Sequence, residues 1–598
     1  MFNLLRTSVA IAILASATTV SAKTDEIVVT AKGNQSISNV LATSYVFTLD
    51  DIEAAQVRDI TGLLDQLPGV SVRDSGGRGS QTSVFVRGAS NSQIIVLIDG
   101  VRVGSATLGA AALNAYSVEA IQRIEVVKGP FSGIYGADAV GGVIQLFTKK
   151  GGEGLGTLAA TMGSNSLQEY SLSFNGGNER NSFHISAQTE DTDGIDRTSI
   201  LSDGNADEDG YEETAVSLGA KLSLGDYTVA NISLLSTDST AEFDNTFGSD
   251  PGLINQGKTF SAALNVSTQL SEYLRWNNLL GSNEDELVTN GAFPSEFVTN
   301  RDSFGSELSY AFTEKGLLTV GLDYYKEDIE SSNNFPVSDR DNTGIYAQVQ
   351  TGLGDFGFVG SLRYDDNSAY GSTSNGSLAL DYNFSENLRT VVSLGSAFVA
   401  PSFNFLYFPF FGNPDIQPEE SDNIELSLIG TSGVIDWRVS VYQTDIKNLF
   451  SFDPSTFLAV NVGQSEFKGL ELELNTQWAE WNLALNADLL SAEDKDSGTK
   501  LDDRAEQTLT ITANRNFGKL DLRFDVKAES GRHDNSGTEL SGFGLFDVSA
   551  KYQFNDNLSL LANIDNVLDK DYTLNLIGAN NRYNTEGRLA QLRLRYNF

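Results

Sequence analysis

The residues near the carboxyl end of the chain alternate strictly between apolar and polar side chains. Leu592, Leu594 and Tyr596 are separated by Arg593 and Arg595. Side chains on a β-strand point alternately to opposite faces, so one face of this segment is apolar and the other carries the arginines. The arginine face must meet water, and the apolar face suits a core or lipid. The segment predicts the last strand of a transmembrane β-barrel or of a soluble β-sandwich.

The same alternation recurs from about residue 151 onward. Leu470, Leu472 and Leu474, for example, alternate with Glu471 and Glu473, and clusters of Gly, Asn, Asp and Ser separate such segments. At roughly 20 residues for each strand with its connection, residues 151–598 predict an all-β transmembrane barrel of about 22 antiparallel strands. A barrel this wide has an open lumen unless another part of the chain fills it.

The preceding 130 or so residues have a mixed pattern instead. Residues 50–67 carry apolar side chains spaced for one face of a helix, and Pro68-Gly69 ends it. Short apolar runs at 83–87, 94–98, 124–127 and 143–148 predict strands. We therefore expect an α+β plug domain at residues 41–150, inside the lumen of the barrel at 151–598, with a linker at 23–40.

The first 22 residues have the pattern of a secretory signal peptide. Arg6 is followed by an apolar run at 9–17 and by the small-residue cleavage pattern Val20-Ser21-Ala22, which predicts Lys23 as the mature start. No later stretch approaches 18 continuous apolar residues. An exported chain that crosses a membrane without such helices must do so as a closed barrel embedded in lipid.

Composition narrows the classes of function. The formal net charge of −39 argues against nucleic acid as a partner and suits a surface bathed in divalent cations. Cys is absent, so no disulfide or thiol nucleophile is available. The two histidines, His184 and His533, lie far apart, and no HExxH or GxSxG motif is present. We therefore expect a protein that is not an enzyme.

Short motifs occur in a fixed order along the chain. They lie at residues 63–70, 86–88, 96–101, 124–130, 135–144, 412–419, 467–471 and 566–572. In kind and order they resemble the TonB-dependent receptors of the Gram-negative outer membrane. The resemblance implies a plugged barrel that binds a scarce ligand outside and releases it inward when the inner-membrane protein TonB pulls on the chain.

An apolar segment just inside the expected mature terminus resembles the energy-coupling box of this family. It comprises Asp25, Glu26, Ile27, Val28, Val29, Thr30 and Ala31. A short extended segment of this kind can add as a strand to the sheet edge of another protein. The resemblance therefore implies that TonB binds residues 25–31.

Within the family the chain is most similar to the cobalamin transporters, in its coupling box and at 342–346, 363–368 and 406–414. This similarity implies transport of cobalamin or another cobamide. A ferric siderophore or another metal chelate is the alternative ligand. A passive porin or an adhesin is the alternative class of protein, and neither of these requires a coupling box or a plug.

An acidic run at 203–211 is a candidate cation site. Its carboxylates at alternating positions, with two glycines, suit calcium, although the spacing and the flanking strands are not those of an EF-hand. The resemblance to cobalamin transporters implies calcium ligands in this loop and its neighbours. They are Asp196, Asp207, Asp209, Asp244 and Asp250. A solvated acidic loop that binds no metal is the alternative.

Candidate substrate contacts follow from the same resemblance. Two polar turns of the plug carry Ser90, Asn91, Ser92 and Gln93, and then Ser105 and Thr107. Small polar groups suit a ligand fringed by amides, and ordinary surface turns are the alternative. Phe243 stands where the family tends to have a tyrosine. Arg504 matches an arginine that points into the lumen.

Charged residues of the plug form a last group. Arg87, Arg123 and Lys128, with Asp99 and Glu125, lie within or beside the predicted plug strands. Wide barrels have polar interiors. We therefore expect these charges to pair across the interface between the plug and the barrel wall.

Overall fold

A computed structural model describes residues 27–28, 35–36, 41–152, 154–200, 206–245, 253–291, 294–453, 456–534, 537–578 and 581–598. Within these residues no helix is long and apolar enough to cross a membrane. Two-residue strands β1 (Ile27–Val28) and β2 (Gln35–Ser36) pair with each other near the start of the chain. The compact domains begin at residue 41.

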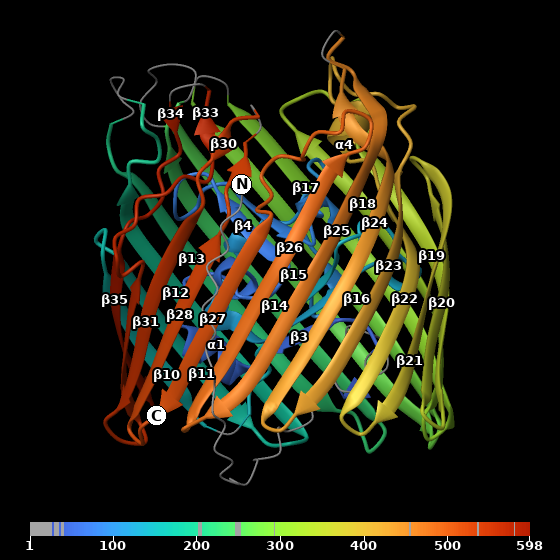
Figure 1. Cartoon of the computed structure of the whole chain (residues 1–598), viewed down its shortest axis with the longest axis horizontal. Coiled ribbons are helices and arrows are strands. Elements are labelled where there is room, and N and C mark those ends of the chain that lie inside the picture. Colours follow the sequence, from blue (N-terminus) through green and yellow to red (C-terminus); the bar gives the residue numbers. More distant parts are fainter. Residues whose placement is uncertain are drawn as a thin grey trace, which may run out of the picture.

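A closed barrel of 22 antiparallel strands forms most of the molecule, as the alternating pattern predicts (Figure 1). Each strand pairs with the next along the chain. The strands are β10 (Gly156–Gly163), β11 (Gln168–Gly177), β12 (Asn181–Ile195), β13 (Asp209–Ser223), β14 (Thr228–Phe243), β15 (Leu253–Ser271), β16 (Leu274–Asn290), β17 (Ser295–Thr313), β18 (Gly316–Ser331), β19 (Asp339–Leu353), β20 (Phe356–Asn367), β21 (Gly371–Ser385), β22 (Leu388–Val399), β23 (Glu419–Ser432), β24 (Ile435–Phe452), β25 (Ala459–Trp478), β26 (Trp481–Asp494), β27 (Gln507–Asn516), β28 (Leu520–Glu529), β31 (Phe543–Gln553), β32 (Leu558–Asp565) and β35 (Leu589–Asn597).

The last strand closes the barrel. β35 pairs with β32 on one side and with the first strand, β10, on the other, where Leu594 faces Ala160. Leu592, Leu594 and Tyr596 remain about half exposed on the outside, whereas Arg595 is buried in the lumen. An apolar outer face and a charged inner face are the arrangement of a barrel in lipid, so the soluble sandwich is excluded.

The two ends of the barrel differ. At one end the strands are joined by short turns, such as 354–355 and 433–434, and this end also holds the carboxyl terminus (Figure 1). At the other end the connections are longer, and they carry α4 (Phe403–Tyr407), β29 (Arg532–His533), β30 (Glu539–Leu540), β33 (Leu576–Ile577) and β34 (Asn581–Arg582). In barrels of the outer membrane, short turns face the periplasm and long loops face outward.

A mixed domain fills the lumen (Figure 1). Its central sheet has the order β3-β8-β9-β6-β7, and β4 and β5 form a separate hairpin. Its elements are β3 (Ser44–Phe47), α1 (Leu49–Ala55), α2 (Ile60–Leu64), β4 (Val70–Asp74), β5 (Thr82–Val86), η2 (Asn91–Gln93), β6 (Ile94–Ile98), β7 (Val101–Arg102), η3 (Leu113–Ala115), η4 (Val118–Ala120), β8 (Ile121–Lys128), α3 (Ser132–Tyr135) and β9 (Gly142–Thr148). We call this domain the plug.

The helix expected at 50–67 is two shorter helices. α1 begins with a capping box between Thr48 and Asp51 and ends at Gln56, which adopts a left-handed conformation. A new cap at Asp59, whose carboxylate accepts a hydrogen bond from the Gly62 amide, then starts α2. The apolar faces of both helices contribute to the core of the plug, in which Leu63, Ile124 and Leu146 are fully buried.

Candidate functional site

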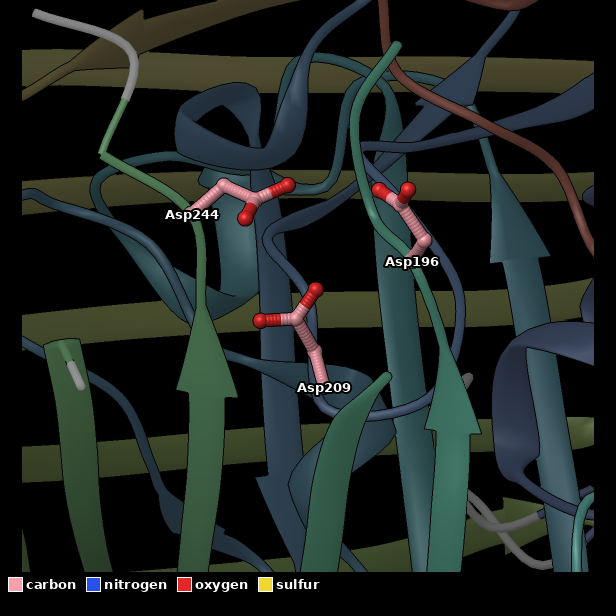
Figure 2. Close-up of side chains that lie close together, drawn as sticks. All are labelled: Asp196, Asp209 and Asp244. Atoms are coloured by element: carbon pink, nitrogen blue, oxygen red, sulfur yellow. The ribbon is translucent and has the colours of Figure 1, made fainter. Parts of the chain in front are cut away.

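Three aspartates converge at the long-loop end of the barrel. Asp196 follows β12, Asp209 begins β13 and Asp244 follows β14, so neighbouring strand ends bring together residues that are up to 48 positions apart in sequence. One carboxylate oxygen from each lies within 4.8 Å of the others. Figure 2 shows the three side chains pointing toward one another. Oxygen ligands in this arrangement suit a hard cation such as calcium.

The protein groups around these carboxylates compensate their charge only in part, through hydrogen bonds and the more distant guanidinium of Arg197. The Thr198 hydroxyl donates to Asp244 at 2.6 Å, and the Arg197 amide donates to Asp209 at 2.9 Å. In the described part of the chain, none of the three carboxylates has an ion-pair partner within 4.0 Å, and Oδ1 of Asp244 is buried without a hydrogen bond. Burial raises the pKa of Asp244 above its ordinary value. It also raises the pKa of Asp209 to about 7, with the Asp244 carboxylate adding to the effect. A bound cation would relieve this mutual repulsion.

The other residues predicted at the cation site are placed differently. Asp207 lies on the exposed part of the same loop, outside the group of three. Asp250 lies outside the described residues. Phe243 ends β14 and is half-buried, next in sequence to Asp244. The structure thus gathers three of the five predicted ligands.

The first polar turn of the plug is held largely by its own hydrogen bonds. Asn91 accepts from the Val84 amide and donates to the Thr82 carbonyl at 3.1 Å, which fixes the turn to β5. Gln93 is buried and donates to Glu419 of the wall at 2.8 Å. Only Ser90 and Ser92 keep half-buried hydroxyl groups, 3.2 Å apart. These two serines are the members of the turn with side chains left for a ligand.

The second polar turn lies between the wall and α4. Thr107 is buried, and its hydroxyl lies 2.8 Å from that of Ser105. The Ala106 amide donates to Thr299 of β17 at 3.0 Å, and its carbonyl accepts from the Phe403 amide of α4 at 3.0 Å. The neighbouring Leu108 is 59 % exposed. Ser105 is the polar side chain that this turn offers to solvent.

Arg504 connects a long outer loop of the wall to the plug. Its guanidinium donates to the Gly88 carbonyl at 3.0 Å and lies over the ring of Phe85, 4.8 Å from the centroid. Both partners belong to the β5 hairpin region of the plug. The side chain therefore points inward, and its contacts fasten the plug to the wall.

Buried charges join the plug to the wall at several places. Arg87 bridges Glu425 of β23 at 2.7 Å and Glu471 of β25 at 2.8 Å, and Lys128 reaches Glu471 at 2.9 Å. All four side chains are less than 10 % exposed. The prediction that Arg87 and Lys128 pair across the interface is confirmed. Removing one member would leave a charge poorly compensated.

Sequence reasoning missed a second such group. Arg78 binds Glu190 of β12 at 3.0 Å and Glu213 of β13 at 3.3 Å. Its signal in the sequence is weak, because a Gly-rich loop surrounds Arg78 and the glutamates lie more than 100 positions away.

The prediction is wrong for the side chains of Asp99 and Arg123, which form ion pairs within the plug. Asp99 binds Lys150 at 2.5 Å and Arg123 binds Glu125 at 2.9 Å, and all four residues belong to the plug and its exit segment. Asp99 also accepts a hydrogen bond from the Thr148 hydroxyl at 2.5 Å. Asp99 therefore ties the turn after β6 to the end of β9, because these two strands are parallel neighbours in the sheet.

Of the predicted coupling box, only Ile27 and Val28 fall within the described residues, where they form β1. Asp25, Glu26, Val29, Thr30 and Ala31 lie outside them.

Family comparisons agree with this architecture. The family described as "TonB dependent receptor-like, beta-barrel" matches residues 155–567, and the "TonB-dependent Receptor Plug Domain" matches residues 36–143. A closed barrel with an internal plug and these two matches define a TonB-dependent receptor. The chain belongs to this family and is a protein of the outer membrane; the long-loop end is its outer end and the short-turn end its periplasmic end.

Named relatives match nearly the whole chain. The chain is 31% identical over 594 residues to the "Vitamin B12 transporter BtuB" of Photobacterium profundum, covering 96% of each chain. It is 28% identical over 571 residues to the protein of the same name from Vibrio cholerae serotype O1, covering 92% of each.

Solved structures share the fold. The ferric-catecholate import receptor Fiu from E. coli K12 matches with a TM-score of 0.80 and 16% identity, covering 96% of this chain and 99% of that one. The siderophore receptor PirA from Acinetobacter baumannii matches with a TM-score of 0.79 and 17% identity, covering 93% and 98%. At these identities the likeness concerns the fold alone.

Proposed function

We propose that this receptor transports cobalamin, or a closely related cobamide, across the outer membrane. The observation that carries the proposal is the 31% identity, over 96% of both chains, to a protein named as a vitamin B12 transporter. The siderophore receptors share the fold at about half that identity. A ferric siderophore is therefore the second candidate ligand.

Calcium at Asp196, Asp209 and Asp244 belongs to the same proposal. The unpartnered buried oxygen of Asp244 and the lack of an ion-pair partner among the described residues support a bound cation there. Because the three carboxylates stand at the ends of β12, β13 and β14, a cation would fasten three outer strand ends together. We expect this to order the loops through which the ligand enters.

Titration of the purified receptor with cyanocobalamin, with and without millimolar calcium, tests both parts. Tight binding that weakens when calcium is chelated is the expected result. Binding that is indifferent to calcium would remove the cation from the proposal. No binding in either buffer would refute cobalamin, and ferric siderophores would then be titrated in the same way.

A matched pair of variants locates the cation. Asp244→Asn keeps the shape of the side chain but removes its charge, and we expect calcium affinity to fall at least tenfold in calorimetry. Asp207→Asn changes an exposed aspartate outside the group of three, and we expect less than a threefold change. Equal effects of the two variants would contradict the site.

Coupling to TonB through residues 25–31 is the remaining part of the proposal. Deleting these residues removes the segment that would add to a partner's sheet edge but leaves the plug and wall intact. We expect uptake of labelled cobalamin by cells to stop while binding to the purified receptor persists. Uptake that survives the deletion would refute energised transport through this segment.

A further inference from the structure

The plug is bonded to the wall by charge on one side only. Around the closed barrel, the strands from β23 to β35 are followed by β10 to β13, because β35 pairs with β10. Within the described residues, every ion pair between plug and wall involves a residue of these strands or of their outer loops. The wall partners are Glu190, Glu213, Glu425, Glu471, Asp503, Lys527, Lys551, Glu586, Arg593 and Arg595. We call this the ionic arc.

The remaining arc, β14 to β22, holds the plug by a different kind of contact. Asn265 of β15 donates to the Asp99 carbonyl at 2.9 Å, and Arg301 of β17 donates to the Arg102 and Gly104 carbonyls at 3.2 and 3.3 Å. In these contacts the plug contributes backbone carbonyls. Among the described residues, the charged side chain of the plug that hydrogen-bonds at this arc is Asp138, which accepts from the Ala400 amide just after β22 at 2.8 Å and forms no ion pair with the wall. Water can replace a partner of a backbone carbonyl at low cost, whereas separating a buried ion pair costs several kcal/mol.

A large cavity of the interface lies on this second arc. It has a volume of about 820 Å³ and is bounded by the plug and by residues of β14 to β19. Amide and hydroxyl side chains form half of its lining, including Gln145, Asn231, Asn265, Ser267 and Asn278, and charged side chains of both signs are also present. It extends from the turn at Asp99-Gly100 to Glu272 and Tyr273, which form the exposed turn between β15 and β16 at the periplasmic end.

The turn at Asp99-Gly100, which lines the cavity, leads into the shortest strand of the plug sheet. β7 has only two residues and pairs with β6 alone, at Leu97–Arg102 and Ile98–Val101. The turn at Asp99-Gly100 precedes it, and the polar turn with Ser105 and Thr107 follows it. A single short segment thus leads from a candidate ligand contact at the outer face to the start of the cavity.

We propose that the ligand crosses the receptor through this cavity, after β7 and the Asp99-Gly100 turn move away from β15 and β16. The ionic arc holds the rest of the plug against the wall during this movement. The amide-rich lining suits a bulky neutral ligand fringed with amides, because each lining amide can both donate and accept. The identity of the ligand rests on the proposed function, whereas the route follows from the bonding of the plug.

A disulfide between β7 and β16 tests the route. A Cβ built on Gly281 would lie 3.3 Å from the Cβ of Val101, close to the spacing of a disulfide, and the chain has no cysteine of its own. In the V101C/G281C variant we expect oxidation to lower uptake of labelled cyanocobalamin by cells at least tenfold and reduction to restore it, with binding unchanged. Full uptake through the oxidised receptor would overturn the proposal.

A tether on the ionic arc is the matched control. The Ser117 hydroxyl of the plug donates to Gln188 of β12 at 2.5 Å, so S117C/Q188C can be joined by a short bifunctional thiol reagent. We expect this tether to leave uptake within twofold of the untreated variant. Loss of uptake with both tethers would show that the plug leaves the wall on all sides and would overturn the one-sided movement.

A second readout separates the route from the choice of ligand. Adding D99N and K150M to the V101C/G281C receptor removes the ion pair that ties the turn to β9. In planar bilayers we expect ion conductance under reducing conditions and its loss on oxidation. Absence of conductance in the reduced form would overturn the route, whereas a receptor that conducts as expected but binds no cobalamin would refute only the proposed ligand.

Discussion

In the proposed calcium site, a proton and the cation would compete for the carboxyl group of Asp209. Burial raises its pKa to about 7, and the nearby Asp244 carboxylate adds to the effect. Metal ligands bind in the deprotonated form, so below pH 7 a proton must leave before calcium can bind. We expect calcium affinity to be constant above pH 8 and to fall by about tenfold for each pH unit well below 7.

Calorimetry of the receptor with calcium between pH 5.5 and 8.5 checks this dependence. The Asp209→Asn variant has no carboxyl to titrate at that position, and its weaker calcium binding should change less with pH. A wild-type affinity that stays flat over the whole range would contradict a role for Asp209 as a ligand.

Arg87 is the single side chain on which the ionic arc depends most, because it bridges two strands of the wall. Arg87→Ala leaves Glu425 and Glu471 with Lys128 as their remaining cation in this group. Removing one partner of a buried pair typically costs about 3–5 kcal/mol. We expect the plug to unfold at lower urea concentration than in the wild type, measured by protease sensitivity of residues 41–150.

Arg180→Ala is the control for that measurement. Arg180 pairs with Asp226 at 2.7 Å, but their side chains are 62% and 78% exposed. Exposed pairs contribute about 0–1 kcal/mol, so this variant should behave as the wild type. Equal sensitivity of the two variants would show that the buried group does not hold the plug.

At the scale of elements, β35 shows how the barrel depends on its lipid face. Leu594 is 48% exposed on the outer surface near the middle of the strand. An arginine at the midplane of a bilayer costs about 2–4 kcal/mol, and one near the interface about 0–1. We expect Leu594→Arg to lower the yield of barrel folded into lipid vesicles, measured by gel mobility. Ala590→Arg, on the same outer face near the end of the strand, should have little effect.

The same strand shows how far the sequence reaches. Its alternation predicts one apolar and one charged face, and the structure has both. The alternation does not predict the ion-pair partners of the charged face. Arg593 and Arg595 contact Glu119 of the plug rather than bulk water, at 2.6 and 3.7 Å. Local periodicity fixes which way a side chain points, but the partner here is 474 positions away in the chain.

The candidate sites also combine features that the sequence predicts with features that depend on the folded structure. Adjacent hairpins predict that loops after β12 and β14 lie close together, and three of the five aspartates do gather there. Which carboxylates turn inward depends on loop conformation, and this is why Asp207 is exposed. The cavity beside β7 has no motif of its own, because it is a mismatch in shape between two domains.

At the scale of the whole molecule, the plug is the only described part of the chain within the lumen that separates the two sides of the membrane. A barrel of 22 strands without its plug has a lumen wide enough for water and ions. We expect a chain that lacks residues 41–150 to insert as a barrel and to conduct ions steadily in a planar bilayer. The full-length receptor is the control and should be closed, and a closed plugless barrel would contradict the assignment of the domain as a plug.

Arg87 belongs to the plug, whereas its partners Glu425 and Glu471 belong to the wall and lie 338 and 384 positions later in the chain. Each domain therefore supplies buried charges here that only the other domain neutralises. A chimera that joins this plug to a foreign barrel would bury an arginine opposite a wall that was not built for it. We therefore expect such a chimera to keep a stable plug only where the foreign barrel carries acidic residues at the places of Glu425 and Glu471.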